Sequence, residues 1–239
     1  MEGALSPPEP IAEAVILCGG LGTRLRSVVS DVPKPMAPIA GRPFLDYVLA
    51  YLAAEGVRRV VFAAGYKSDA IQARYGARWG DQDLAYSIET EPLGTGGALR
   101  QALERLESEA GMVVNGDSLP LSPMAPLAAP LAAGADLVLT ASRRQDTAGG
   151  GVCEVRGGRL TGFHAGAAGE AGLVNAGVYA VRRNLFAGLD LPAAFSFERD
   201  VLEAMASRLD VRVVVSAADF IDIGLPATYA AAQGLLAGP

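Results

Sequence analysis

Histidine and cysteine are scarce in this sequence. Its 239 residues include one histidine, His164, and two cysteines, Cys18 and Cys153. A lone histidine argues against a histidine-rich zinc site and against a Ser-His-Asp triad. Both cysteines fall in apolar segments that we expect to be buried strands. Free thiols in a reducing cytoplasm are therefore predicted instead of a disulfide.

The sequence also lacks a basic excess and a long apolar run. Its formal net charge is −6, and an acidic chain does not steer itself onto nucleic acid. No apolar run approaches the roughly 20 residues that a membrane-spanning helix needs, so no membrane partner is expected. Residues 1–12 have neither the basic start nor the apolar stretch of a signal peptide. We therefore predict a flexible leader at residues 1–12 and one cytoplasmic domain at residues 13–239.

Two familiar phosphate-binding motifs are missing as well. There is no Walker A loop, and Leu25 stands where a dinucleotide-binding fingerprint needs its third glycine. Instead, a glycine-rich turn at residues 19–24 directly follows an apolar run at residues 14–18. Its backbone N–H groups suit phosphate oxygens, and the cations Arg24 and Lys34 neutralise charge. This order is typical of a nucleoside triphosphate site, although such a turn alone can be a plain strand-to-helix connection.

Strand and helix patterns alternate through the first half of the chain. The expected strands are 14–18, 59–64, 84–88, 112–115 and 137–141, and the expected helices are 43–55, 69–75 and 97–109. The second half predicts a hairpin at 152–163, a strand at 174–181, a helix at 196–207 capped by Ser196, a strand at 211–215, and a last helix after Pro226. This rhythm predicts an α/β, Rossmann-like fold with a mostly parallel mixed sheet, helices on both faces and a small β-hairpin part.

Two aspartates stand where such a sheet binds ligands, beyond the carboxyl ends of its strands. Asp117 follows the strand at 112–115, and Asp222 lies between Ile221 and Ile223. A carboxylate framed by isoleucines is costly unless it has a partner. Two converging carboxylates would bind Mg²⁺, which shares oxygen ligands with substrate phosphates. Either aspartate alone can equally be a turn or cap residue.

A second glycine-rich turn lies at residues 91–98. Its backbone donors and acceptors suit the edge of a nucleotide base, although taken alone it can be a connecting loop. Asn175, within the strand at 174–181, could bind a sugar hydroxyl or simply lie at the edge of a strand ladder.

Together these segments resemble the sugar-1-phosphate nucleotidyltransferases, also called nucleotide-sugar pyrophosphorylases. Residues 17–25 resemble the phosphate-loop signature of this family, residues 33–35 its lysine motif, and residues 91–98 its base-binding loop. Residues 115–117 and 220–224 resemble its two metal-aspartate segments. The similarity runs from about residue 13 to residue 236. Residues 26–36 and 220–224 also resemble the branch of the family that makes GDP-D-glycero-α-D-manno-heptose.

The resemblance implies a GT-A-like fold, in which the hairpin part binds the sugar, and a reaction of a nucleoside triphosphate with a sugar 1-phosphate that needs Mg²⁺. The implied catalytic residues are Arg24, Lys34, Asp117 and Asp222, and the two aspartates are the implied metal ligands. The implied nucleotide-binding residues are Leu17, Gly19, Gly20, Gly22, Thr23, Glu91, Pro92, Gly94, Thr95, Gly96 and Gly97. The implied sugar-binding residues are Asn115, Gly116, Gly151 and Asn175. The branch points to GTP and the heptose phosphate as partners, and leaves monomer and homo-oligomer open.

One departure from the family concerns the sugar phosphate. Family members often carry a Glu-Lys pair after the residue matching Phe163, but residues 164–169 contain no lysine. Either another cation serves this phosphate, or the phosphate binds differently, or activity is weakened. Mannose-1-phosphate guanylyltransferase, N-acetylmuramate-1-phosphate uridylyltransferase and a catalytically silent nucleotide-binding subunit stay as alternatives. A glycosyltransferase would predict an Asp-x-Asp motif, which residues 115–117 do not supply.

Overall fold

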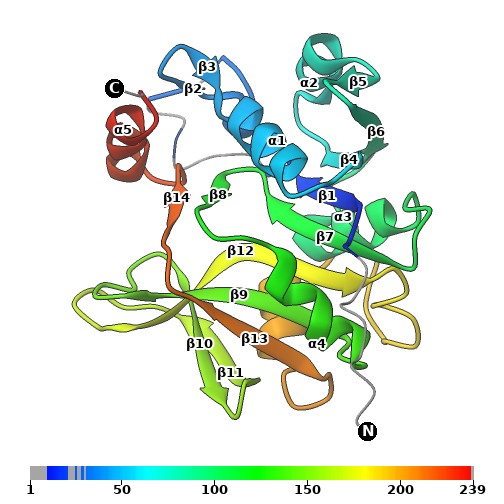
Figure 1. Cartoon of the computed structure of the whole chain (residues 1–239), viewed down its shortest axis with the longest axis vertical. Helices are drawn as coiled ribbons and strands as arrows, with labels where there is room; N and C mark the ends of the chain where they lie inside the picture. Colours follow the sequence, from blue (N-terminus) through cyan, green and yellow to red (C-terminus); the bar gives the residue numbers. More distant parts are fainter. Residues whose placement is uncertain (1–9, 21–24, 26–27, 30, 238–239) are drawn as a thin grey trace, which may run out of the picture.

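A ten-stranded mixed sheet is the framework of this computed structural model, which describes residues 10–20, 25, 28–29 and 31–237 (Figure 1). The sheet order is β10-β11-β13-β9-β12-β7-β1-β4-β6-β5. Four neighbouring strands are parallel: β7 (Ala110–Asn115), β1 (Glu13–Leu17), β4 (Arg59–Ala64) and β6 (Gln82–Ile88). The other strands are β5 (Arg78–Trp79), β9 (Leu137–Arg144), β10 (Gly151–Arg156), β11 (Arg159–Ala165), β12 (Gly172–Arg182) and β13 (Val211–Ser216). The predicted mixed sheet is confirmed, with β12 antiparallel to both β7 and β9.

Short ladders and helices complete the fold. The ladders pair β2 (Pro38–Ile39) with β3 (Arg42–Pro43) and β8 (Ser118–Pro120) with β14 (Phe220–Asp222). The α-helices are α1 (Phe44–Ala54), α2 (Ser68–Tyr75), α3 (Gly94–Leu103), α4 (Ala128–Ala132) and α5 (Pro226–Leu235). Lys34–Met36 and Ala125–Leu127 are 3₁₀ turns, and Phe197–Glu203 is a π-helix. Among the residues that the structure describes, no helix is long and apolar enough to cross a membrane.

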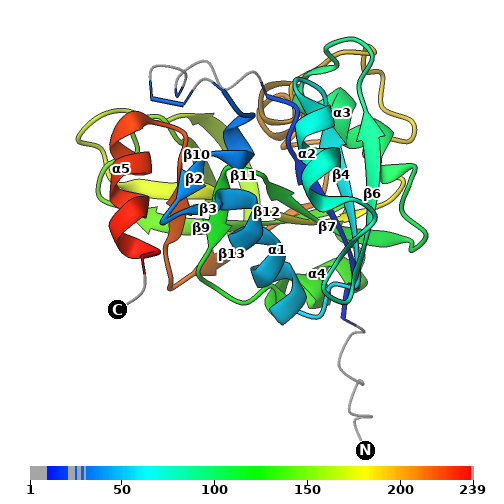
Figure 2. The same ribbon diagram turned by 90° about the horizontal axis from the view of Figure 1, so that it is seen from above.

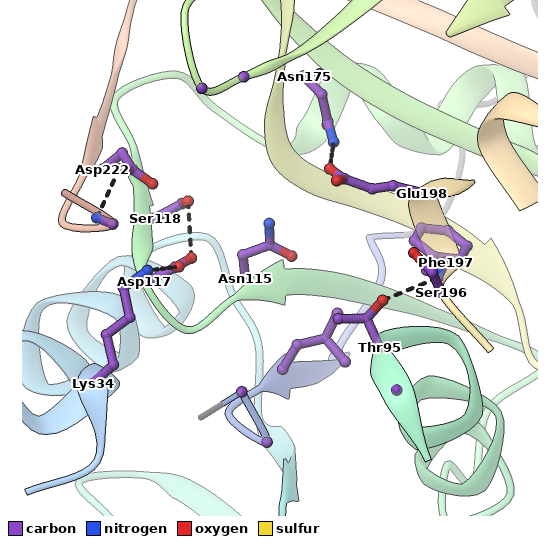
Figure 3. Close-up of a pocket in the computed structure, with 18 of the residues that line it drawn as sticks. Lys34, Thr95, Asn115, Asp117, Ser118, Asn175, Ser196, Phe197, Glu198 and Asp222 are labelled. Atoms are coloured by element: carbon purple, nitrogen blue, oxygen red, sulfur yellow. Dashed lines mark hydrogen bonds and ion pairs between the residues drawn. The ribbon is translucent and has the colours of Figure 1, made fainter. Parts of the chain in front are cut away.

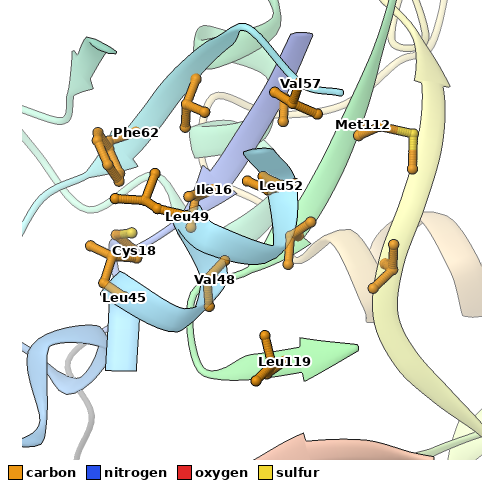
Figure 4. Close-up of a cluster of buried hydrophobic side chains, with 14 of the residues drawn as sticks. Ile16, Cys18, Leu45, Val48, Leu49, Leu52, Val57, Phe62, Met112 and Leu119 are labelled. Atoms are coloured by element: carbon orange, nitrogen blue, oxygen red, sulfur yellow. The ribbon is translucent and has the colours of Figure 1, made fainter. Parts of the chain in front are cut away.

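Alternate residues of the central strands point to opposite sides of the sheet, and helices cover both sides, so both faces are buried. Ile16 of β1 and Phe62 of β4 pack under α1, whose apolar residues Leu45, Val48, Leu49 and Leu52 cover this face (Figure 4). Val15 and Val61 point to the other face, where they join a cluster with α3 and the π-helix. The predicted arrangement of helices on both faces is therefore confirmed, and Figure 2 shows the layers from above.

Both predicted ends of the helix at 97–109 were wrong. Helix α3 begins earlier, at Gly94, whose φ of +68° suits glycine. It ends at Leu103 because the buried carboxylate of Glu13 accepts the N–H groups of Glu107 (3.0 Å) and Ser108 (2.7 Å). These donors are therefore taken by a side chain from the start of β1, and the helix cannot continue through them.

The predicted hairpin and helix cap of the second half are confirmed. Gly157 and Gly158 form the turn between β10 and β11, with φ values of +59° and +75° that favour glycine. The hydroxyl of Ser196 accepts the Arg199 N–H at 3.2 Å and so caps the π-helix. That helix ends at Glu203, four residues before the predicted boundary at 207.

Candidate active site

A cavity of about 1130 Å³ opens at the carboxyl ends of the parallel strands (Figure 3). Residues after β1, β4, β6, β7 and β9 contribute to its wall, together with the start of β10 and residues of β12. This is the edge where an α/β sheet binds its ligands, and the volume exceeds the usual range of about 300–1,000 Å³ for a small-molecule site. The cavity therefore has room for two substrates side by side.

Most residues predicted for the site line this cavity. From the nucleotide-binding set these are Leu17, Gly19, Gly20, Glu91, Pro92, Gly94 and Thr95. From the catalytic and sugar-binding sets they are Lys34, Asp117, Asp222, Asn115, Gly151 and Asn175. Gly22, Thr23 and Arg24 lie outside the described residues, so their roles stay predictions.

The small β8–β14 ladder brings the two predicted metal aspartates together. Asp117 lies in the turn between β7 and β8, and Asp222, the last residue of β14, pairs opposite Ser118. The Ile223 N–H donates to the Asp117 carbonyl oxygen at 3.0 Å, which joins the two segments at this point. The ammonium group of Lys34 forms an ion pair with Asp117 (Figure 3). Residues far apart in sequence thus meet in one charged cluster.

The electrostatics of this cluster favour a further cation. Burial raises the pKa of Asp222, and the negative charge of Asp117 raises it further. The Gly224 N–H, which donates to Asp222 at 2.7 Å, and the charge of Lys34 act in the opposite direction. Because the net effect is a raised pKa, the ionised form of Asp222 is disfavoured here unless a further cation offsets its charge.

The donor set fits Mg²⁺. No group of three or more His, Cys, Asp or Glu side chains that could hold a metal occurs among the described residues. Mg²⁺, however, usually takes one or two carboxylates and completes its shell with water and substrate phosphates. The carboxylates of Asp117 and Asp222 meet that requirement, since they face a cavity large enough for a phosphate-bearing substrate.

Three of the predicted binding glycines have packing roles instead of lining the cavity. The N–H groups of Gly96 and Gly97 both donate to the carbonyl oxygen of Phe195, at 2.9 and 3.4 Å. A Cβ at Gly96 would lie 2.2 Å from the Phe195 ring, and one at Gly116 would lie 2.8 Å from the Leu17 carbonyl oxygen. These glycines let neighbouring segments approach closely, and a direct contact with substrate stays a prediction.

Two asparagines face the predicted sugar end of the cavity (Figure 3). The register of β12 shifts between Asn175 and Tyr179, where Gly177 has a φ of +72°. A side chain at Gly177 would approach the Asn115 amide nitrogen within 2.7 Å, so the bulge leaves space for Asn115. The amide nitrogen of Asn175 donates to the hydroxyl of Tyr179 (2.6 Å) and to a carboxylate oxygen of Glu198 (3.1 Å). The Gly177 N–H donates to the Asn175 side-chain oxygen at 3.1 Å, so the tertiary structure orients Asn175 through three hydrogen bonds.

Sequence reasoning missed six charged residues of the cavity wall: Glu89, Arg144, Asp146, Glu198, Arg199 and Glu203. Glu89 and Arg144 lie at the carboxyl ends of β6 and β9, the same signal that identified Asp117. The Glu89 carboxylate accepts the Leu93 N–H at 2.7 Å. Glu198 lies in the helix that the sequence predicted at 196–207, but no role was predicted for this residue.

Arg144 and Arg199 both line the cavity, and Arg144 lies at the carboxyl end of β9. Its guanidinium donates to the Phe220 carbonyl oxygen at 3.0 Å, pairs with Asp219 at 2.8 Å and lies 4.4 Å from the Phe220 ring centroid. Its Nε is buried and has no hydrogen-bond partner among the described residues. These contacts hold the guanidinium against Phe220, which precedes Asp222 by two residues in β14.

Neither cysteine has the properties of a nucleophile. Burial, with a contribution from the charge of Asp117, raises the pKa of Cys18 far above its ordinary value. Burial and the charge of Glu198 raise the pKa of Cys153 to about 12. Both thiols are free and stay protonated near neutral pH. Chemistry in this cavity therefore depends on charge and positioning.

The comparison with known families agrees with this geometry. The family model described as nucleotidyl transferase matches residues 13–237. This chain belongs to the nucleotidyl transferase family. Among curated relatives, the D-glycero-α-D-manno-heptose 1-phosphate guanylyltransferase of Aneurinibacillus thermoaerophilus is 40% identical over 92% of this chain and 96% of that protein. The enzyme of the same name from Campylobacter jejuni is 36% identical over 91% of this chain and 96% of its own length.

Solved structures give the same result. HddC from Yersinia pseudotuberculosis superposes with a TM-score of 0.83 and 31% identity, covering 94% of this chain and 99% of its own. A second structure of HddC, complexed with GMP-PN, has a TM-score of 0.81 and 32% identity, with the same coverage of both chains. The predicted family, the predicted nucleotidyltransferase class and the predicted α/β fold are confirmed by these matches.

Proposed function

We propose that this nucleotidyl transferase moves a guanylyl group from GTP to D-glycero-α-D-manno-heptose 1-phosphate, giving the GDP-sugar and pyrophosphate. One observation carries the proposal: the similarity to two enzymes with this name extends over nearly the whole of each chain. The cavity supports it, because a volume of about 1130 Å³ admits a nucleotide and a sugar phosphate together.

The reaction needs no protein nucleophile. An oxygen of the sugar phosphate bonds to the α-phosphorus of GTP, while the bond from that phosphorus to the oxygen bridging to the β-phosphorus breaks. The departing pyrophosphate keeps the electron pair. Because both reactants are anions, this chain's residues act by neutralising charge and by aligning the attacking oxygen with the leaving group.

Each charged residue has a proposed task. Lys34 holds the α-phosphate or the incoming sugar phosphate from its place beside Asp117. Asp117 and Asp222 would hold Mg²⁺, which would neutralise phosphate charge when bound. Arg24, in the glycine-rich turn, is proposed to bind the β- and γ-phosphates.

Arg144 is proposed to serve the sugar phosphate in place of the lysine that residues 164–169 lack. It lines the cavity at the end of β9 and contacts β14 through the Phe220 carbonyl. Its guanidinium is fixed by Asp219 and the Phe220 carbonyl, so it loses little further freedom when a phosphate binds.

The buried, free thiols of Cys18 and Cys153 support a reducing, cytoplasmic location.

The test is a matrix of substrates. Purified protein is incubated with Mg²⁺ and inorganic pyrophosphatase, with five nucleoside triphosphates against heptose, mannose, glucose and N-acetylmuramate 1-phosphates. Phosphate release is followed, and products are identified by mass spectrometry. We expect release with GTP and the heptose phosphate, and GDP-heptose as the product.

Other outcomes of the matrix overturn the proposal in distinct ways. Release with mannose 1-phosphate or a different base replaces the substrate but keeps the reaction. Nucleotide binding without turnover in any combination favours a silent regulatory subunit instead. Arg24→Ala tests the phosphate loop separately, because we expect it to lower turnover by orders of magnitude in a folded protein.

A further inference from the structure

Hydrogen bonds join the start of α3 to residues 192–195, the segment before the π-helix. The Phe195 N–H donates to the Leu93 carbonyl at 2.9 Å, and the Phe195 carbonyl accepts the Gly96 N–H at 2.9 Å. Arg100 of α3 donates to the Pro192 carbonyl at 2.9 Å. The first N–H groups of a helix have no partner within it, and here the Phe195 carbonyl satisfies two of them, those of Gly96 and Gly97. These two N–H groups are consequently not free for a phosphate or a base, whereas Gly94 and Thr95 still line the cavity.

Thr95 adds a side-chain hydrogen bond between the same two segments, in the wall of the cavity. Its hydroxyl oxygen accepts the Phe197 N–H at 2.9 Å, as the dashed line in Figure 3 shows. Phe197 begins the π-helix, whose first turn is capped by Ser196 and carries Glu198 as its next residue. The hydroxyl of Thr95 thus fixes the backbone directly before Glu198.

Glu198 continues the connection to the sugar end of the cavity. Its carboxylate accepts the Asn175 amide at 3.1 Å, and Asn175 in turn donates to Tyr179 at 2.6 Å. The rings of Tyr179 and Phe197 pack edge to face with centroids 5.2 Å apart, which closes the loop of contacts. A continuous set of contacts therefore runs from the glycine-rich turn at residues 91–98 to Asn175, the residue predicted to bind the sugar.

We infer that Thr95 is a positioning residue for the sugar end of the site, acting through Phe197 and Glu198. It lies in the turn predicted to bind the nucleotide, yet its hydroxyl is directed at the segment that orients Asn175. Removing the hydroxyl should loosen Glu198 and leave the base-side backbone in place, since the Phe195 bonds do not involve the Thr95 side chain. This inference rests on the proposed function, which decides which end of the cavity binds the nucleotide and which end binds the sugar phosphate.

The experiment compares Thr95→Val, which keeps the shape and removes the acceptor, with Thr95→Ser, which keeps the acceptor. Steady-state kinetics are measured with each substrate varied in turn. For Thr95→Val we expect the KM of the sugar phosphate to rise about 3- to 10-fold, which corresponds to the loss of one partly exposed hydrogen bond. The KM of GTP should stay at the wild-type value, and Thr95→Ser should behave as wild type in both.

Three results would overturn the inference. A rise in the KM of GTP would make Thr95 a nucleotide contact. Unchanged kinetics in Thr95→Val would make the bond to Phe197 purely structural. Equal defects in the Val and Ser variants would show that the hydroxyl is not the group that matters.

A double-mutant cycle tests the route through Glu198. If Thr95 acts by placing that carboxylate, Thr95→Val should add nothing to the KM defect of Glu198→Ala, whereas additive effects would contradict the route. Any sugar phosphate that the wild type accepts serves in these assays, so an error in the proposed sugar leaves the test intact. If the wild type binds but does not turn over, the same comparison is made with dissociation constants from calorimetry, for GTP and for the sugar phosphate separately.

Discussion

Replacing Asp222 with asparagine should move stability and activity in opposite directions. In the metal-free protein the pKa of Asp222 is raised, first by burial and second by the charge of Asp117, so its ionised form disfavours folding. Asparagine has nearly the same shape and keeps an oxygen for the Gly224 N–H, which donates at 2.7 Å. Removing the charge should therefore stabilise the metal-free protein by about 1 kcal/mol, a melting-temperature gain of about 2–4 °C for a chain of this size.

The sign of the pH dependence follows from the same shift. In the unfolded chain an aspartate loses its proton near its ordinary pKa of 3.8, whereas the raised pKa keeps Asp222 protonated to higher pH in the folded state. Stability contributed by the bound proton is thus present below pH 3.8 and is lost as the pH rises through the folded pKa. The advantage of Asp222→Asn should be absent below the ordinary pKa and should grow as the pH rises through the raised pKa of the folded state.

Activity should fall in the same variant. The asparagine cannot supply the negative charge proposed to hold Mg²⁺, and the loss of one such preorganised group costs about 10²- to 10³-fold in turnover. Thermal unfolding in EDTA at pH 7 and at pH 3.5, together with pyrophosphate release at pH 7, measures both effects. Asp83→Asn is the matched control, because Asp83 lies at the start of β6, next to the edge strand β5, with its side chain 63% exposed and only a long ion pair to Arg78 at 3.6 Å. A variant that is less stable than wild type in EDTA at pH 7, or fully active, would refute the reasoning.

Three other predictions concern the cavity and its support. Arg144→Ala should raise the KM of the sugar phosphate about tenfold, the loss of one charge-assisted contact, with the KM of GTP unchanged; kinetics with each substrate varied decide it, and an unchanged KM removes Arg144 from the site. Gly96→Ala places a Cβ 2.2 Å from the Phe195 ring and should lower the free energy of unfolding by about 1–3 kcal/mol. Urea titration measures this loss, and a wild-type midpoint would contradict the close packing. Glu13→Ala removes the acceptor of two backbone N–H groups at 2.7 and 3.0 Å and should cost about 2–4 kcal/mol; the same titration, with Glu13→Gln as the milder control, checks it.

Much of the fold could be predicted from the sequence because its signals are local. The apolar runs that became β1, β4 and β7 are bounded by glycine or charge, and the spacing of apolar residues in α1 matches the face that it buries. Alternation of strands and helices then requires a largely parallel sheet with both faces covered. The hairpin turn at Gly157 and Gly158 was equally local.

Element ends were harder, because distant residues determine them. Glu13 ends α3 by taking the N–H groups of Glu107 and Ser108, although nearly a hundred residues separate them. At the other end, the Phe195 carbonyl accepts the N–H groups of Gly96 and Gly97 in the first turn of the same helix. No periodicity within residues 94–109 carries this information, since helix capping by tertiary partners depends on the assembled fold.

The candidate site divides in the same way. Residue types and their places after strands were enough to predict a phosphate-binding turn, two acidic ligands and a nucleotidyltransferase, because each depends on a short motif at a strand end. Only the tertiary structure paired Lys34 with Asp117, gave Gly96 a packing role and put Arg144 against Asp219 and Phe220. The physical reason is that motifs encode which groups are present, whereas distances between segments arise only when the β8–β14 ladder and the sheet have formed.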